Sequence, residues 1–161
     1  MIKITKPLLQ KALITGFFSA FTIGVLTVLT YKSTLGYFLA GSFGSSMVLL
    51  FGFPESPFAQ PKNVFFGHLV TSAVGVLILM FLPVDQFLQI AIAVGLGIFV
   101  MILLGVTHPP AGGNPIVIIL GAVSYDFLLN PIIFGSIIII VYAIILNRFI
   151  LKKNYPSNWK S

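Results

Sequence analysis

The stretch Thr107-His108-Pro109-Pro110-Ala111-Gly112-Gly113-Asn114-Pro115 decides how the rest of the chain is interpreted. It holds three prolines and two glycines in nine positions, so it cannot be continuous regular helix. Apolar segments lie on both sides of it. An apolar chain therefore interrupts its backbone here, and the interruption contains one of only two histidines.

The composition around this stretch is that of a membrane protein. Of the 161 residues, 58% are hydrophobic and 7% are charged, whereas a soluble domain carries about a quarter charged residues. A soluble fold of this length has too little interior to bury so much apolar surface. We therefore expect an all-α polytopic membrane protein.

The cysteine count and the charge exclude other classes. The absence of cysteine excludes disulfides and thiolate chemistry. The net charge of +6 comes from chain ends and loops, where cations indicate topology rather than nucleic-acid binding.

The chain divides into six hydrophobic segments, and its two halves resemble each other. Gly44–Gly52 aligns with Gly113–Gly121, and Val64–Gly67 with Ile132–Gly135, at offsets of 69 and 68 residues. We expect a single transmembrane domain over residues 1–161, made of two three-segment repeats that are inverted relative to each other. The first repeat covers about residues 12–82 and the second about residues 87–151. The six hydrophobic segments are residues 12–30, 35–53, 64–82, 87–106, 115–123 and 131–151.

The distribution of cations predicts the orientation. If all six segments cross, eight of the nine cations share a side with both termini and His108, and only Lys32 is opposite. The positive-inside rule then places the termini in the cytoplasm, and we expect the cell (inner) membrane. The alternative arrangement has four full spans and two re-entrant segments. It leaves seven cations inside and two outside, so the sequence does not exclude it. Small residues four apart, as in Gly67, Thr71 and Gly75, predict close helix packing.

The first half contains a matching break, Gly41-Ser42-Phe43-Gly44-Ser45-Ser46. Each break precedes about nine apolar residues, or about 14 Å of helix, roughly half a bilayer core. The first amides of such a helix lack intrahelical partners and carry partial positive charge, so two of these ends brought together would bind an anion. The predicted substrate site consists of both breaks and the two histidines: Gly41, Ser42, Gly44, Ser45, Ser46, His68, His108, Ala111, Gly112, Gly113 and Asn114.

The histidines have two interpretations. They are donors to an anion or carriers of a proton, since histidine titrates near neutrality; alternatively they are neutral residues hydrogen-bonded to carbonyls. A third metal ligand and a nucleophile elbow are both missing, so we expect no metal, no cofactor and no enzymatic activity. In the proline-rich loop of residues 54–63, Gln60 and Lys62 are candidates for a gate or vestibule, unless Lys62 simply pairs with Glu55 at the surface.

The same residues carry a family resemblance. The chain resembles the HPP family of integral membrane proteins, named for a His-Pro-Pro triplet that here is His108-Pro109-Pro110, followed by Ala111-Gly112. A second signature of the family is similar to three stretches of this chain: Gly41–Ser46, Pro54-Glu55-Ser56-Pro57 and Gly67-His68. The resemblance implies a protein usually described with four transmembrane helices, and nitrite transport, in which cyanobacterial and chloroplast members are implicated. Gly113-Asn114-Pro115 departs from the Ala-Thr-Ala of many relatives, which puts the substrate in question, and we expect no soluble regulatory domain here.

These observations predict a transporter or channel for a small monovalent anion, with nitrite the first choice. The expected partners are the anion, the lipid bilayer and further copies of the chain in a homo-oligomer, with no nucleic acid. The alternative is a membrane scaffold or assembly module that transports nothing.

Overall fold

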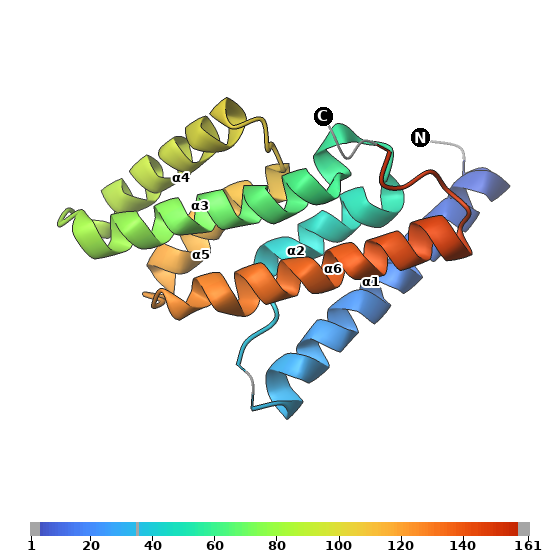
Figure 1. The fold of residues 1–161 in the computed structure, drawn as a ribbon, viewed down its shortest axis with the longest axis horizontal. Helices are drawn as coiled ribbons and strands as arrows, with labels where there is room; N and C mark the ends of the chain where they lie inside the picture. Colours follow the sequence, from blue (N-terminus) through green and yellow to red (C-terminus); the bar gives the residue numbers. More distant parts are fainter. Residues whose placement is uncertain (1–3, 35, 158–161) are drawn as a thin grey trace.

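The computed structural model describes residues 4–34 and 36–157, and this part of the chain is helical without strands, which confirms the all-α prediction (Figure 1). The elements are α1 (Lys6–Lys32), α2 (Gly41–Met47), the π-helix η1 (Val48–Gly52), the 3-10 helix η2 (Pro57–Ala59), α3 (Pro61–Phe81), α4 (Gln86–Leu103), the 3-10 helix η3 (Pro109–Gly113), α5 (Asn114–Leu120), the π-helix η4 (Leu128–Ile133), α6 (Phe134–Ile144) and the π-helix η5 (Ile145–Ile150).

Four helices are long and apolar enough to cross a bilayer: α1, α3, α4 and the continuous run Leu128–Ile150. Asn130 has extended dihedral angles, φ −123° and ψ 116°, so the last helix effectively begins at Pro131, where the Asn-Pro pair predicts a start. Asp85 occupies the N-cap position of α4, although its side chain makes no capping hydrogen bond.

The two short helices begin at the breaks, with a difference in the first half. The sequence suggests a helix start at Ser45, but α2 starts at Gly41, so residues 41–46 form its first turns. Helix satisfies its own backbone groups, and this matters most where water is excluded. In the second half α5 starts at Asn114, directly after the 3-10 turn of η3.

Each interrupted segment runs from one end of the bundle to the other (Figure 1). Near the end of α1, the Phe38 N–H donates to Thr30 Oγ1 at 3.0 Å, whereas in the first half of α1 Thr15 Oγ1 donates to the Phe51 carbonyl at 3.4 Å. Residues 104–120 likewise leave the end of α4 and reach its beginning, where Gln86 Nε2 donates to the Ile119 carbonyl at 3.2 Å. This path favours six crossings over the re-entrant arrangement.

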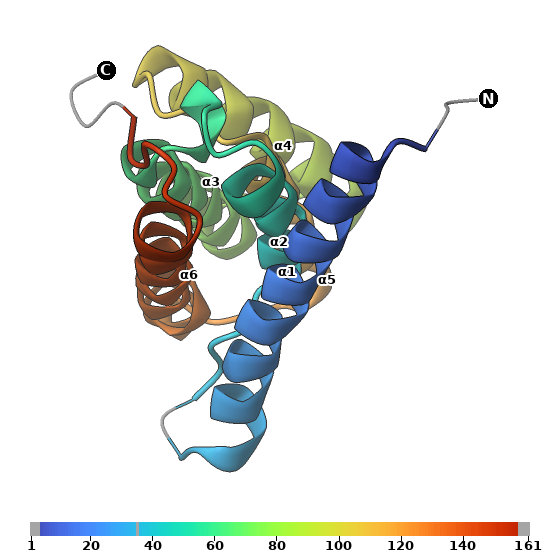
Figure 2. The same cartoon turned by 90° about the vertical axis from the view of Figure 1, so that its right-hand side faces the viewer.

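Helix α3 lies between α4 and α6 in both views and contacts the second break through its glycines (Figures 1 and 2). A Cβ added at Gly67 would lie 2.7 Å from the His108 Cβ, and one at Gly75 would lie 2.9 Å from the Pro115 Cα. The Gly67–Thr71–Gly75 ridge is thus a close-packing surface. The α6 glycine, Gly135, contacts the first break in the same way, since its Cβ would lie 2.5 Å from Phe43 Cε2.

Helix α1 lies at the edge of the bundle, and its later half extends away from the other helices (Figure 2). Large apolar side chains along it are exposed, including Leu13 at 64% and Phe17 at 66%. In a bilayer this surface faces lipid or another chain.

Candidate functional site

The breaks meet at a buried group of polar side chains, the His68–His108 cluster, which comprises Ser42, Ser46, His68, Ser72, His108 and Asn114. None of the six is more than 9% exposed. Helix α2 supplies the two serines at positions 42 and 46, and α3 supplies His68 and Ser72; both pairs are four residues apart and so share a helix face. His108 precedes η3 and Asn114 begins α5.

The Ser46 hydroxyl lies between the two imidazoles. Its Oγ is 2.8 Å from His108 Nε2 and 3.1 Å from His68 Nε2. The ring centroids of the histidines are 4.9 Å apart. One hydroxyl therefore joins the two rings, although they come from segments forty residues apart in the chain.

On its other side His68 faces the start of α5. Its Nδ1 is 3.1 Å from Asn114 Nδ2 and 3.5 Å from Ser42 Oγ. The same amide nitrogen donates to Ser72 Oγ at 2.9 Å. Asn114 thus connects the second break to two successive turns of α3.

The other nitrogen of His108 is bound by the proline-rich loop. Nδ1 lies 2.7 Å from the carbonyl oxygen of Phe58, which can only accept, so Nδ1 carries the proton and Nε2 is an acceptor. The ring is fully buried, with 0% of His108 exposed. Among the described residues, no third His, Asp, Glu or Cys gathers with the two histidines as a metal ligand would.

Two further contacts hold His108 in place. Asn63 Nδ2 donates to the carbonyl of Thr107 at 2.9 Å, and the backbone N–H of His108 donates to Met101 Sδ at 3.4 Å. The His-Pro-Pro segment is thereby attached to both α3 and α4.

The remaining residues predicted for the substrate site lie around the cluster rather than in it. The residues Gly41, Gly44 and Ser45 are exposed; Ala111 is buried, and Gly112 and Gly113 are half-buried.

Several of the amides expected to bind an anion are already bonded. The N–H of Ala111 donates to the His108 carbonyl at 2.9 Å, that of Asn114 to the Ala111 carbonyl, and that of Phe43 to the Ala40 carbonyl at 3.0 Å. Side chains, rather than bare amides, are therefore the donors that the cluster offers.

Gln60 and Lys62, the predicted gate, lie outside the cluster. Gln60 is 2% exposed, and its Nε2 donates to the carbonyls of Pro54 and Ser56 at 3.0 and 2.9 Å. Its Oε1 accepts from the Ser157 N–H at 2.9 Å, so Gln60 ties the loop to the last described residues. Lys62 is partly exposed beside an apolar groove between α3 and α6.

Sequence reasoning missed Ser72 and the Phe58 carbonyl. Ser72 follows His68 by four residues, which places both on one face of a helix, and that spacing is a usable signal. The Phe58 contact involves a backbone atom, for which the sequence carries no signal.

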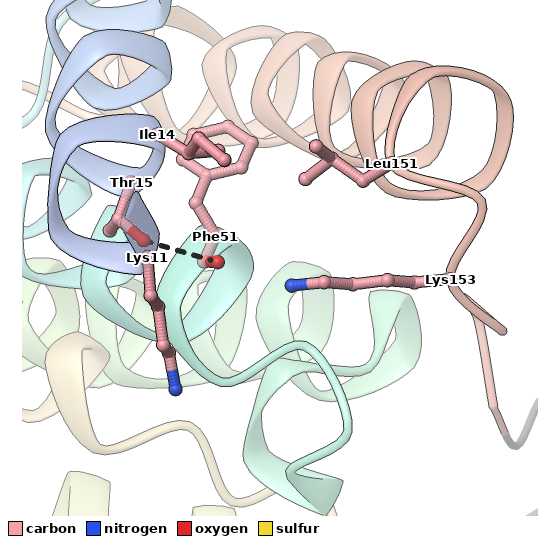
Figure 3. Close-up of a pocket in the computed structure, with 6 residues that line it drawn as sticks. All are labelled: Lys11, Ile14, Thr15, Phe51, Leu151 and Lys153. Carbon is pink, nitrogen blue, oxygen red and sulfur yellow. Dashed lines mark hydrogen bonds between the residues drawn. The ribbon is translucent and has the colours of Figure 1, made fainter. Parts of the chain in front are cut away.

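A basic cavity of about 320 Å³ opens beside α1 at the end of the bundle where the proline-rich loop lies (Figure 3). Figure 3 shows Lys11 and Lys153 on one side of this cavity and the apolar side chains of Ile14, Phe51 and Leu151 on the other. The Lys11 Nζ also lies 4.1 Å from the Phe53 ring centroid, a cation–π contact.

Comparison with known proteins agrees with this architecture. Residues 4–156 match the family model described as "HPP, transmembrane region". This chain belongs to the HPP transmembrane family. Two curated transmembrane proteins of Dictyostelium discoideum are similar to this HPP chain: one is 33% identical over 145 residues, covering 84% of the chain and 51% of the relative, and the other is 35% identical, covering 84% and 47%.

The HPP chain therefore spans about half the length of the curated relatives it matches. No solved structure matches it.

Proposed function

We propose that this HPP protein transports a small monovalent anion across the membrane and carries out no enzymatic reaction. The observation that supports the proposal is the His68–His108 cluster, where two interrupted segments meet inside a bundle of apolar helices. Irregular backbone at membrane depth is tolerated only where protein covers it or where it lines a polar path. A buried set of polar side chains at that place supports a substrate path rather than a purely structural role.

The chemistry of the cluster favours a singly charged anion. The hydroxyls of Ser42 and Ser46, the Asn114 amide and the imidazoles offer neutral N–H and O–H donors. Burying an ion without a counter-charge is costly, and the cost rises steeply with the charge on the ion. Neutral donors therefore suit nitrite, formate or chloride better than a divalent anion. The preference for nitrite rests on the family resemblance.

The basic cavity is a candidate access route. The cations at Lys11 and Lys153 raise the local anion concentration at the end of the bundle that leads to His108. Four more described cations, Lys6, Lys62, Arg148 and Lys152, lie towards this end, and Lys3 and Lys160 lie outside the described residues. By the positive-inside rule we assign this end of the bundle to the cytoplasmic side of the cell membrane.

The test is flux into liposomes that contain the purified protein. Uptake of nitrite is compared with that of nitrate, formate and chloride, and protein-free liposomes give the passive leak of nitrous acid. We expect saturable uptake that falls at least about tenfold in Asn114→Ala, as expected when about 1.4 kcal/mol or more of binding is lost. Absence of saturable flux for all four anions would contradict the proposal.

The scaffold alternative makes a different prediction. A membrane assembly module would keep its function in His108→Ala and lose it when Gly67→Leu disrupts packing against His108. A homo-oligomer is also part of the proposal, supported by the exposed apolar surface of α1. Light scattering of the purified protein, corrected for bound detergent, measures the number of chains.

A further inference from the structure

We propose that His68, Ser46 and His108 form a proton relay, which moves one proton with each anion between the middle of the bundle and the proline-rich loop. This proposal rests on the proposed anion transport and adds its coupling ion. It follows from the order in which donors and acceptors are arranged in the cluster.

The direction of each hydrogen bond follows from the Phe58 carbonyl. His108 Nδ1 donates to that oxygen at 2.7 Å, so His108 Nε2 accepts from the Ser46 hydroxyl at 2.8 Å. The single hydroxyl hydrogen of Ser46 is then used, and Ser46 Oγ accepts from His68 Nε2 at 3.1 Å.

The chain of bonds continues to the second break. With its proton on Nε2, His68 has a free lone pair on Nδ1, and the Asn114 amide donates to it at 3.1 Å. These tautomers are assigned from the network, and each ring nitrogen has a partner of the opposite kind. All the bonds point the same way, from Asn114 to Phe58.

A one-way chain of this type can pass a proton by sequential transfer. A proton delivered by nitrous acid or by water binds His68 Nδ1, His68 Nε2 passes its proton to Ser46 Oγ, and Ser46 passes its own hydrogen to His108 Nε2. His108 then releases its Nδ1 proton to a water molecule at the loop. Each step forms one N–H or O–H bond and breaks another, so one proton enters at His68 and one leaves at His108 without a change in the net charge of the side chains. Both imidazoles end in the opposite tautomer, so the rings and the Ser46 hydroxyl rotate back before the next proton is passed.

The relay covers about the first third of α3, on the side of the proline-rich loop. His68 is seven residues into α3, about 10 Å from its start, and Ser72 beside Asn114 is about 17 Å from it, close to the middle of the helix. At the other end the Phe58 side chain is 40% exposed. The relay therefore links the place where an anion would sit to the surface at the loop.

No other ionisable side chain lies along this path within the described elements. The helices α2, α4, η3 and α5 and the turn η2 carry none. On α3 the only other one is Lys62, at its partly exposed first turn. Close to Phe58, the Tyr155 hydroxyl donates to the Ala59 carbonyl at 2.8 Å, so its hydrogen is already used.

The Ser46 hydroxyl is also where the relay can be interrupted. A second acceptor, the Ser42 carbonyl, lies 3.1 Å from Ser46 Oγ. Rotation of the hydroxyl from His108 to this carbonyl breaks the chain at one atom. A relay that opens and closes in this way couples proton movement to the state of the site.

The experiment measures anion flux and proton flux in the same proteoliposomes, with a pH-sensitive dye inside and a nitrite gradient across the membrane. Protein-free vesicles give the leak of nitrous acid. In the unmodified protein we expect saturable acidification in step with nitrite uptake. In Ser46→Ala we expect the number of protons moved per nitrite taken up to fall at least about tenfold, whatever the change in nitrite uptake itself.

The matched control is Ser136→Ala, which removes another buried helical serine hydroxyl, one without a hydrogen-bond partner among the described residues. It should leave both fluxes unchanged. If Ser46→Ala does not yield folded protein, His68→Gln replaces it, because an amide keeps a donor near Ser46 but cannot pass a proton on.

The outcomes separate the two proposals. Saturable nitrite uptake without acidification in the unmodified protein, or acidification that survives both Ser46→Ala and His68→Gln, would overturn the relay and leave anion transport standing. Absence of saturable uptake of nitrite, nitrate, formate or chloride would contradict anion transport itself, and the relay with it.

Discussion

At the scale of single residues, the hydrogen bond from His108 to the Phe58 carbonyl contributes to stability. The bond is 2.7 Å long and the His108 side chain is buried. Removing the donor leaves the carbonyl without this partner, which costs about 1–3 kcal/mol.

Thermal unfolding in detergent checks this prediction. We expect His108→Ala to lower the Tm, and His108→Asn, which keeps a donor for the Phe58 carbonyl, to lower it less. Equal Tm values for His108→Ala and the unmodified protein would show that this bond does not stabilise the fold.

The sequence identifies much of this site at residue level. The histidines, two of the serines and Asn114 are all predicted, because polar side chains beside backbone breaks are rare in an apolar chain. The particular bonds are not predictable, since they depend on tertiary distances such as the 2.8 Å between Ser46 and His108. The sequence predicts backbone amides as the main anion donors. In the structure the amides of Ala111 and Asn114 are bonded locally, so the side chains are the donors that the cluster offers.

At the scale of elements, α3 is positioned by the glycines that contact the second break. Gly67→Ala would place a methyl group 2.7 Å from the His108 Cβ and 3.0 Å from the Val106 carbonyl oxygen. We expect a loss of about 1–3 kcal/mol in stability, as for other overpacked sites. Gly95→Ala on α4 is the control, because no atom lies within 4 Å of its added Cβ, and alanine favours helix.

Thermal unfolding of both variants, at one pH and in one detergent, measures the difference. A Gly67→Ala protein as stable as Gly95→Ala would mean that α3 and the His-Pro-Pro segment are separated by more than the structure shows. Nitrite uptake by the same proteins tests whether the contact also matters for transport.

Element by element, length and apolarity are enough to predict the four long helices. They are not enough for the short ones. The Gly41–Ser46 segment contains residues that favour turns, yet it is helical, because a buried backbone gains more from satisfying its own hydrogen bonds than these residues lose in propensity.

At the scale of the whole molecule, the absence of cysteine makes topology directly measurable. In single-cysteine variants we expect Glu55→Cys and Lys153→Cys to react with an impermeant maleimide from one side of the membrane, and Lys32→Cys and Ser124→Cys from the other. If Glu55→Cys instead reacted from the same side as Lys32→Cys, the result would contradict six crossings and support the re-entrant arrangement.

The interrupted segments also affect how the chain is made. Helix α5 is about 10 Å long and Gly41–Gly52 about 18 Å, whereas the hydrocarbon core is about 30 Å thick. Neither segment can enter lipid alone, because its extended portion would expose unpaired backbone groups to hydrocarbon. We therefore expect each interrupted segment to enter the bilayer together with the long helix that follows it in the chain, rather than on its own.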